Sequence, residues 1–222
     1  VVFFGDCLEN RDILLRQKAE LAEQSKKQTE LQTALMLSQI QPHFLYTAIS
    51  AIRYLCKTNP ADAYTSLGQF ADYLRGNMDA LGNGRVIPFS KEMEHIKTYL
   101  SLEQLRFGED LQVEYRIEYE DFSLPALTVQ PIVENAVRHG ATMNEQGGKI
   151  VIATRKAPDG AIVTVTDNGP GFDSDVLPAD GKSHFGLNNV RNCLKVNDYG
   201  ELSVSATPGG GATVSILIKS KS

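Results

Sequence analysis

The sequence contains no tryptophan, only three cysteines and no long apolar run. The cysteines, Cys7, Cys56 and Cys193, lie far apart and form no C-x-x-C pair, so neither a disulfide framework nor a zinc site is predicted. Scattered cysteines of this kind are typical of a reducing compartment. No segment reaches the roughly 20 apolar residues of a membrane-spanning helix, so none is predicted within the chain.

An excess of positive charge is also missing. The net charge is −5 and the isoelectric point is about 5.4, whereas a nucleic-acid-binding protein normally presents a basic face. We therefore expect no nucleic-acid partner. The 222 residues, 42% hydrophobic and 22% charged, suffice for one or two domains that each bury a core.

Glycine and proline are absent from residues 10–41, which are rich in Leu, Glu, Gln and Lys and are predicted to form one long helix. A seven-residue repeat runs through Leu14, Leu21, Gln28 and Leu35, but most of the interleaved positions are polar. The pattern fits a weak coiled-coil seam, and a solvated helix is the alternative.

Two amphipathic helices follow Pro42, joined by a turn at residues 57–60. One apolar stripe contains Leu45, Ile49, Ile52 and Cys56, and the other contains Tyr64, Leu67, Ala71, Leu74 and Met78. An antiparallel hairpin cannot cover both stripes by itself. We expect it to dimerise into a four-helix bundle.

The rest of the chain predicts a different architecture. A loop at residues 81–84 precedes a helix for which Ser90 is the expected N-cap. The pattern then predicts strands at 111–119, 149–156, 161–167, 201–206 and 212–219, and helices at 127–139 and 186–196. Strands grouped in pairs with helices between them indicate an α+β sandwich rather than a doubly wound parallel sheet.

His43 is the first residue with chemical potential. On a helix it shares a face with Thr47 and Tyr54, opposite the apolar stripe, so its imidazole is expected to face solvent. Neutral imidazole is a competent nucleophile near pH 7. An exposed helical histidine with no role is the alternative.

A second polar set lies on the predicted helix within residues 131–140. Asn135, Arg138 and His139 share one face, whereas the apolar residues between them point to the core. An amide oxygen is a suitable ligand for Mg²⁺, and a nearby cation can hold a phosphate. The alternative is a polar helix face without a ligand.

Two glycine-containing segments complete the candidates. Asp167 ends a predicted strand and can accept a hydrogen bond from an exocyclic amine, while Gly169 and Gly171 permit close approach of a flat ligand. A plain Asn-Gly turn is the alternative. Residues 186–190 open a helix whose free N–H groups can receive phosphate, after a polar segment, 173–185, with the composition of a mobile lid.

The order and spacing of these segments resemble those of bacterial sensor histidine kinases. The matching motifs are Pro-His-Phe-Leu-Tyr, Glu-Asn-Ala-Val-Arg-His-Gly, Asp-Asn-Gly-Pro-Gly-Phe, Gly-Leu-Asn-Asn-Val-Arg and Gly-Gly-Ala-Thr-Val. They look like the H, N, G1, G2 and G3 boxes of that family. The phosphoacceptor box is similar to that of the LytS-like subgroup, which typically works with LytTR-type response regulators.

The resemblance implies roles for individual residues. His43 would accept the phosphoryl group, and Thr47 would orient a water for dephosphorylation. Asn135 would bind Mg²⁺, with Arg138 and His139 on phosphate; Asp167 would hold the adenine amine, assisted by Thr213 through water. Gly169 and Gly171 would border the adenine, and Gly186, Leu187 and Asn189 would close over the triphosphate of ATP.

The resemblance also implies an organisation and a fold. Residues 1–34 would form a signalling helix or coiled-coil linker, 35–80 a dimerisation and histidine phosphotransfer hairpin, 81–108 a connecting loop and helix, and 109–222 an ATP-binding domain of the GHKL (Bergerat) type. The chain would be the cytoplasmic part of a homodimeric bacterial kinase, with a membrane anchor or sensor upstream and the receiver domain of a response regulator as partner.

One difference from gyrase-like hydrolases favours phosphotransfer. Those enzymes place a water-activating Glu four residues before the metal-binding Asn, and that position is Pro131 here. The alternatives are a GHKL-type ATPase that uses ATP as a conformational clamp, and a catalytically weak dimeric signalling relay. The G2 box keeps the second of these open, because His184 stands where many relatives have a second glycine.

Overall fold

The computed structural model describes residues 42–80, 86–141, 147–171, 185–196, 198–207 and 210–220, together with Lys18 and Glu23. The predicted long helix and lid lie outside these residues, apart from those two positions and Phe185. The chain divides into two compact units, Val1–Tyr46 and Thr47–Ser222. The fold described below is that of the second unit, with helix α2 given from its first residue, Pro42, in the first unit.

A helical hairpin formed by α2 (Pro42–Thr58) and α3 (Pro60–Ala80) confirms the predicted pair of helices. Asn59 alone connects them. Its backbone N–H donates to Leu55, and its side-chain oxygen accepts from the Asp62 N–H at 3.3 Å, so it ends one helix and caps the next. Pro60 follows at the first helical position, where its missing N–H costs nothing.

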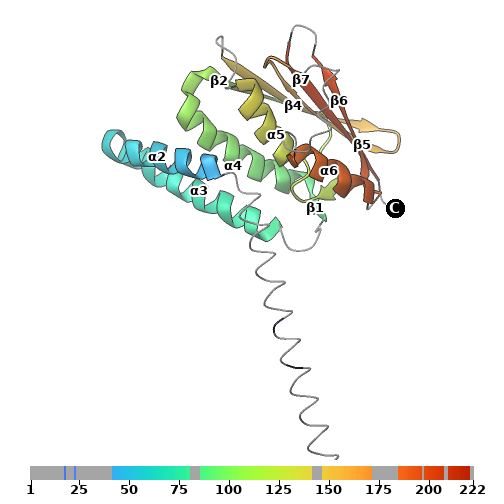
Figure 1. The fold of residues 1–222 in the computed structure, drawn as a ribbon, viewed down its shortest axis with the longest axis horizontal. Coiled ribbons are helices and arrows are strands. Elements are labelled where there is room, and N and C mark those ends of the chain that lie inside the picture. Colours follow the sequence, from blue (N-terminus) through green and yellow to red (C-terminus); the bar gives the residue numbers. More distant parts are fainter. Residues whose placement is uncertain are drawn as a thin grey trace, which may run out of the picture. The chain divides into compact units, whose positions relative to one another are not determined.

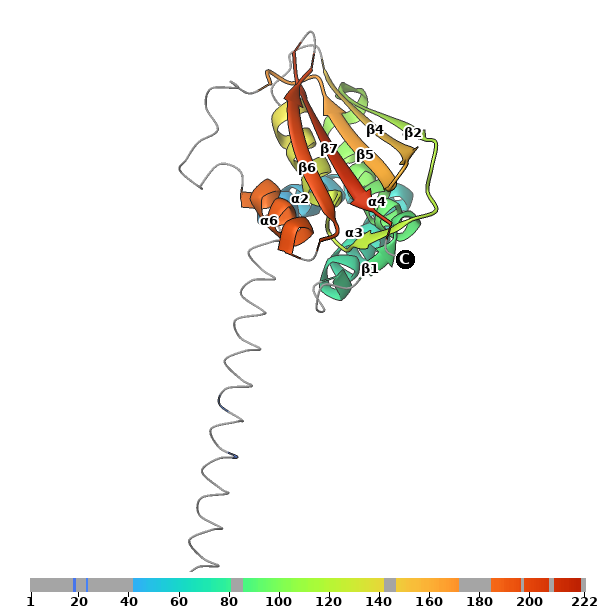
Figure 2. The same ribbon diagram turned by 90° about the vertical axis from the view of Figure 1, so that its right-hand side faces the viewer.

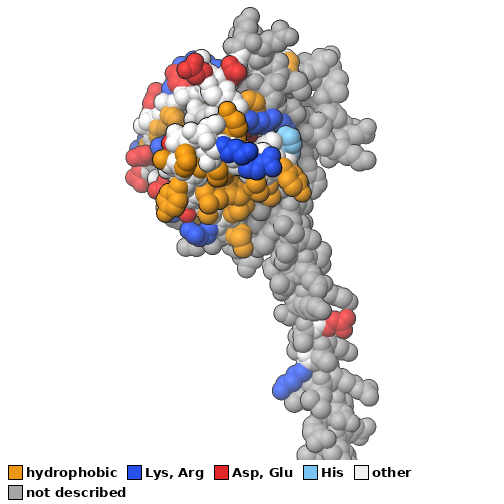
Figure 3. Space-filling model, turned by 90° about the vertical axis from the view of Figure 1, so that its left-hand side faces the viewer, with side chains coloured by type: hydrophobic (Ala, Val, Ile, Leu, Met, Phe, Trp, Pro, Cys, Tyr) orange, Lys and Arg blue, Asp and Glu red, His pale blue; other side chains and the backbone are white. Residues whose placement is uncertain are grey.

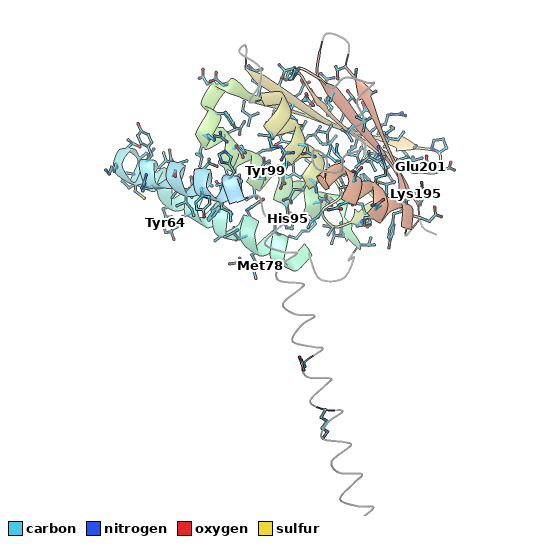
Figure 4. All side chains as sticks on the ribbon, in the orientation of Figure 1. Tyr64, Met78, His95, Tyr99, Lys195 and Glu201 are labelled. Atoms are coloured by element: carbon cyan, nitrogen blue, oxygen red, sulfur yellow. The ribbon has the colours of Figure 1, made fainter. Side chains whose placement is uncertain are left out.

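The predicted apolar stripe of α3 faces outward. Tyr64, Leu67 and Met78 are 83%, 55% and 59% exposed, and Figure 4 shows Tyr64 and Met78 at the outer side of the helix. Figure 3 shows hydrophobic side chains gathered on the face seen from the α2–α3 turn. A second face of α3 packs inside the chain, against α4 (Phe89–Phe107). Its buried residues are Ala63, Ser66, Phe70, Tyr73 and Asn77.

Helix α4 begins at Phe89, so the prediction of Ser90 as N-cap is wrong. Pro88 precedes the helix and provides no side-chain cap. The start is fixed by a small antiparallel sheet, because β1 (Val86–Pro88) pairs with β3 (Ser123–Pro125). The Phe89 N–H donates to Phe122 O at 2.9 Å, and the two rings stack with centroids 4.6 Å apart. Tertiary contacts therefore replace a local cap.

The main sheet has five strands in the order β2-β4-β5-β7-β6. Strand β2 (Leu111–Ile117), which follows the short helix η1 (Gly108–Asp110), runs parallel to β4 (Gly148–Ala157). The remaining pairs are antiparallel and involve β5 (Gly160–Asp167), β6 (Gly200–Ala206) and β7 (Ala212–Lys219). Both predicted strand pairs are present, and the α+β class is confirmed.

One face of this sheet carries the core. Residues along β5 and β7 alternate between buried and half-buried, so every second side chain points to the same face. Figure 1 shows α4, α5 (Gln130–Ala136) and α6 (Phe185–Val196) on that face. Figure 2 shows the opposite face, over which none of the described helices lies.

Helix α5 starts at Gln130, three residues later than predicted, and its cap comes from another helix. Glu92 on α4 accepts hydrogen bonds through Oε1 from the backbone N–H groups of Val129 at 2.6 Å and Gln130 at 3.2 Å. The preceding Leu127 has a positive φ of 60°, a strained conformation for leucine. The carboxylate of Glu92, distant in the sequence, thus satisfies N–H groups at the start of α5 for which no nearby side chain provides a cap.

The Glu92 carboxyl group is buried with only 1% of its surface exposed, and its Oε2 atom has no hydrogen-bond partner among the described residues. Burial raises the pKa of Glu92 from 4.5 to about 7, against the lowering effect of the backbone hydrogen bonds. The folded state therefore binds this proton more tightly than the unfolded state. The resulting stabilisation is complete below pH 4.5 and is lost as the pH rises through about 7.

We predict that Glu92→Gln flattens this pH dependence. Between about pH 5 and about pH 8 the wild type should lose stability on the order of 3 kcal/mol through this group, and the variant should lose much less. Thermal unfolding across that range measures the difference. Glu94→Gln is the matched control, because Glu94 is exposed and bonds Lys91, which lowers its pKa. An unchanged pH profile in Glu92→Gln would contradict the prediction.

The outward stripe of α3 generates a second prediction. Leu67→Glu places a charge in the surface expected to pair with a second copy, and burying an unpaired charge is costly. Light scattering at micromolar concentration should show a dimer for the wild type and a dissociation constant at least about tenfold higher for the variant. Thr65→Glu, on an exposed position away from the stripe, should leave the dimer intact. A monomeric wild type would refute the expectation.

Candidate functional site

Helix α5 presents the predicted metal-binding amide. As predicted, its apolar side chains are buried, namely Ile132, Val133 and Ala136, as is Val137 just after it. Asn135 is half-buried and Arg138 is exposed, and the Arg138 guanidinium donates from Nη2 to Asn135 Oδ1 at 2.8 Å. The atom expected to bind Mg²⁺ thus accepts a charge-assisted hydrogen bond from a neighbouring side chain.

Beyond α5 the chain widens into a π-helical turn, η2 (Val137–Ala141), which includes His139. The turn carries Gly140 against the end of β5. A Cβ atom at Gly140 would lie 2.6 Å from Cβ of Asp167, closer than any real contact allows. The structure therefore brings the two predicted motifs, that of Asn135 and that of Asp167, into direct contact.

The Asp167 carboxylate is fixed by the backbone around it. Its Oδ1 atom accepts hydrogen bonds from the N–H groups of Gly169 at 2.9 Å and Ala212 at 3.3 Å. Burial raises the pKa of Asp167, while these two bonds act in the lowering direction. With Oδ1 held in this way, the other oxygen can accept a hydrogen bond from a ligand amine.

Glycines make this close packing possible. Gly211 has a φ of +95°, and a Cβ there would lie 2.0 Å from the carbonyl oxygen of Asp167. Gly171 has a φ of +74°, and a Cβ there would lie 3.0 Å from Gly211 O. The predicted close approach at Gly171 therefore includes a packing contact with Gly211, just before β7. Gly211 is thus a further residue of the site region, which the sequence indicated only through the motif Gly-Gly-Ala-Thr-Val.

Strand β7 meets Asp167 at Ala212 rather than at Thr213. The Thr213 hydroxyl lies 3.0 Å from the hydroxyls of both Thr166 and Thr207. Thr166 is also its partner in the strand register, and successive side chains of a strand point to opposite faces. The structure thus does not bring the Thr213 hydroxyl to the Asp167 carboxylate.

The remaining predicted residues lie on two other helices. Gly186 is in the first turn of α6, followed by the half-buried Leu187 and the exposed Asn189. His43 is exposed and lies one helical turn before the half-buried Thr47 on α2. The exposure of His43 agrees with its predicted position on the polar face of that helix.

Glu134 is turned away from Asn135. Its Oε1 atom accepts hydrogen bonds from the Tyr73 hydroxyl at 3.3 Å and from Gln130 Nε2 at 2.9 Å, and its side chain is buried. Pro131 occupies the position four residues before Asn135. Neither residue can therefore serve as a water-activating base beside the amide, because a general base must reach the proton that it removes.

Within the described ranges, no group of three or more His, Cys, Asp or Glu side chains could hold a metal ion. A magnesium ion bound with a nucleotide needs only one or two protein oxygens. In the same part of the chain, none of the helices is long and apolar enough to cross a membrane.

Comparisons with known proteins give one consistent answer. Residues 31–111 match the family model described as histidine kinase, and residues 121–222 match that of the histidine kinase-, DNA gyrase B- and HSP90-like ATPases. The uncharacterised protein YwpD of Bacillus subtilis is 37% identical over 196 residues, which cover 86% of this chain and 70% of YwpD.

Two further likenesses concern a sensor protein and a solved domain. The sensor protein LytS of B. subtilis is 34% identical over 182 residues, covering 80% of this chain but only 30% of LytS. The nucleotide-free catalytic domain of the histidine kinase ThkA is 14% identical, has a TM-score of 0.51, and covers 61% of this chain and 94% of that domain. The likeness to ThkA concerns the fold.

The geometry of Asp167 generates a prediction for nucleotide binding. In Asp167→Asn the amide oxygen can still accept the bonds from Gly169 and Ala212, so the fold should persist. The amide nitrogen would then face the ligand amine, donor against donor. We expect adenine-nucleotide affinity to fall roughly 10- to 100-fold in calorimetry, with little change in melting temperature.

Asp198→Asn is the control for this experiment, since Asp198 is exposed and bonds Lys219 away from the site. Unchanged affinity in Asp167→Asn would show that this carboxylate does not recognise the base.

Proposed function

The chain belongs to the bacterial sensor histidine kinases of two-component systems, with LytS among its relatives, and we propose that it transfers the γ-phosphoryl group of Mg-ATP to His43. In this step the bond from γ-phosphorus to the β,γ-bridging oxygen breaks, a P–N bond to the imidazole forms, and ADP and a proton leave. The phosphoryl group then passes to an Asp in the receiver domain of a response regulator, of the LytTR type by resemblance.

The observation that supports this most directly is the contact between Gly140 and Asp167. It joins the segment that offers an amide oxygen to the strand end that offers a carboxylate acceptor, so a single ligand with a base and a phosphate chain could use both. The bonds from Gly169 and Ala212 pre-set the carboxylate, which lowers the cost of ordering it on binding.

In the proposed complex Asp167 holds the adenine amine, with Gly169 and Gly171 beside the base. Asn135 Oδ1 would be the protein ligand of Mg²⁺ in place of its present bond from the Arg138 guanidinium. Magnesium would neutralise charge on the phosphates during transfer. Arg138, released from Asn135, contacts phosphate together with His139, while Gly186, Leu187 and Asn189 lie at the triphosphate.

Phosphoryl transfer to histidine is favoured over hydrolysis of ATP because no water-activating base stands four residues before Asn135. Pro131 cannot accept a proton, and the Glu134 carboxylate is committed to Tyr73 and Gln130. A bound γ-phosphate would thus persist until a nucleophile such as His43 reaches it. Catalysis would rest on positioning and charge neutralisation.

The proposal extends to the partners of the chain and to the cellular compartment of the reaction. Two copies would pair through the outward stripe of α3, and the receiver domain would approach the exposed His43. Thr47, one turn further along, would orient a water that removes the phosphoryl group. Because ATP and response regulators are cytoplasmic, the reaction would take place in the cytoplasm. The chain spans less than a third of LytS, so the stimulus would be sensed by segments outside this sequence.

Incubation with γ-labelled ATP tests the proposal. The wild type should acquire label that acid removes, as expected for a P–N bond, and His43→Gln should lose at least about 99% of it while keeping ATP affinity. His95→Gln is the matched control, because that imidazole packs against Gly76 between α3 and α4. Persistent label in His43→Gln, or release of inorganic phosphate without protein label, would refute histidine phosphorylation.

A further inference from the structure

The inner face of α3 is unusually polar for a helix that packs inside a chain. Tyr73 and Asn77, one turn apart, are only 3% and 6% exposed. Both contact α5, the helix that carries the proposed magnesium ligand. Buried polar groups that lose their partners cost stability, so such pairs constrain geometry more strictly than apolar packing does.

Two hydrogen bonds join the helices, and a third lies within α5. Gln130 Nε2 donates to Asn77 Oδ1 at 2.9 Å, and the Tyr73 hydroxyl donates to Glu134 Oε1 at 3.3 Å. Gln130 Nε2 also donates to Glu134 Oε1 at 2.9 Å. We call these four residues the α3–α5 polar contact.

The protonation state of Tyr73 in the α3–α5 polar contact is set mainly by burial. Desolvation, and then the charge of Glu134, raise the pKa of Tyr73, so its hydroxyl keeps its proton and stays a donor at physiological pH. A buried carboxylate that loses a donor is left poorly solvated, and the protein must move to compensate. Loss of the Tyr73–Glu134 hydrogen bond would therefore cause α5 to shift.

Helix α5 has little rigidity of its own. It comprises seven residues, about two turns, and so short a helix is marginal without tertiary support. Gln130 and Glu134 are one turn apart on the same side, and Asn135 follows Glu134 by a rotation of about 100° around the axis. Fixing Gln130 and Glu134 therefore fixes the direction in which Asn135 projects.

We propose that Tyr73 and Asn77 are positioning residues for the magnesium site, which they control by setting the rotation of α5 through Glu134 and Gln130. The inference rests on the proposed function, because it takes Asn135 as the metal ligand. It adds that the metal-binding strength of the ATP site depends on α3, a helix of the phosphoacceptor hairpin. A shift of α3 would change magnesium binding without altering any residue that touches the nucleotide.

Adenine recognition should depend on this contact much less than magnesium binding does. Asp167 is held by backbone groups of Gly169 and Ala212, which do not belong to α3 or α5. The dependence of ATP affinity on magnesium is thus a readout that general loosening of the fold would not reproduce. General loosening would lower ATP affinity equally with and without the metal.

The experiment measures ATP affinity by calorimetry in excess Mg²⁺ and in EDTA. Tyr73→Phe removes one hydroxyl and keeps the ring, and should reduce the affinity gain given by Mg²⁺ about five- to tenfold, with EDTA affinity within about twofold of wild type. Asn77→Leu, which removes the acceptor for Gln130, should show the same pattern. Tyr64→Phe, at an 83% exposed position on the same helix, is the matched control.

The outcomes separate the two proposals. Equal losses with and without Mg²⁺ in both variants, or no loss in either, would overturn the positioning role while leaving the kinase proposal intact. A wild type that binds no ATP in either condition would overturn the proposed function and the positioning role with it. Loss confined to the magnesium-dependent part, with normal melting temperature, would support the positioning role.

Discussion

Close backbone packing around Asp167 is the constraint on which the candidate site depends. Gly140, in the turn after α5, lies against the Asp167 side chain, and Gly211, just before β7, lies against the Asp167 backbone; neither position has room for a Cβ atom. The carboxylate is consequently enclosed by backbone and accepts two of its N–H groups. Residues from three distant parts of the chain become one site because glycine permits the approach.

Helix α5 achieves its orientation with buried polar groups where an apolar interface would have been more stable. Glu92 caps its first turn from α4, and Glu134 bonds to α3. A buried carboxylate contributes little to net stability, since desolvation offsets most of what its hydrogen bonds supply. It does specify the direction of α5, because each of its hydrogen bonds forms in only one arrangement of the helices. These buried carboxylates therefore fix the orientation of a short helix at the ligand site.

Local patterns in the sequence predicted much of the fold but not its long-range polar contacts. The α2–α3 hairpin, the β4–β5 hairpin and the buried side of α5 follow from periodicity and turn residues. Helix starts at Phe89 and Gln130 were missed because a strand pair and Glu92 determine them. Tyr73 bonds a residue 61 positions away, and no local pattern reports such a partner. The role of Thr213 came from the family resemblance, whereas the bond from the Ala212 backbone N–H to Asp167 depends on strand pairing, which side-chain chemistry does not report.

The pairing of β1 with β3 limits where the domains of such kinases can be recombined. Val86, Ile87 and Pro88 add a strand to the ATP-binding half, and the helix that follows them delivers Glu92 to α5. A chimera joined at residue 109 would separate this strand and this carboxylate from the half that they complete. Recombination that preserves a working ATP site would have to cut ahead of Val86, so that this short strand stays with the half that it completes.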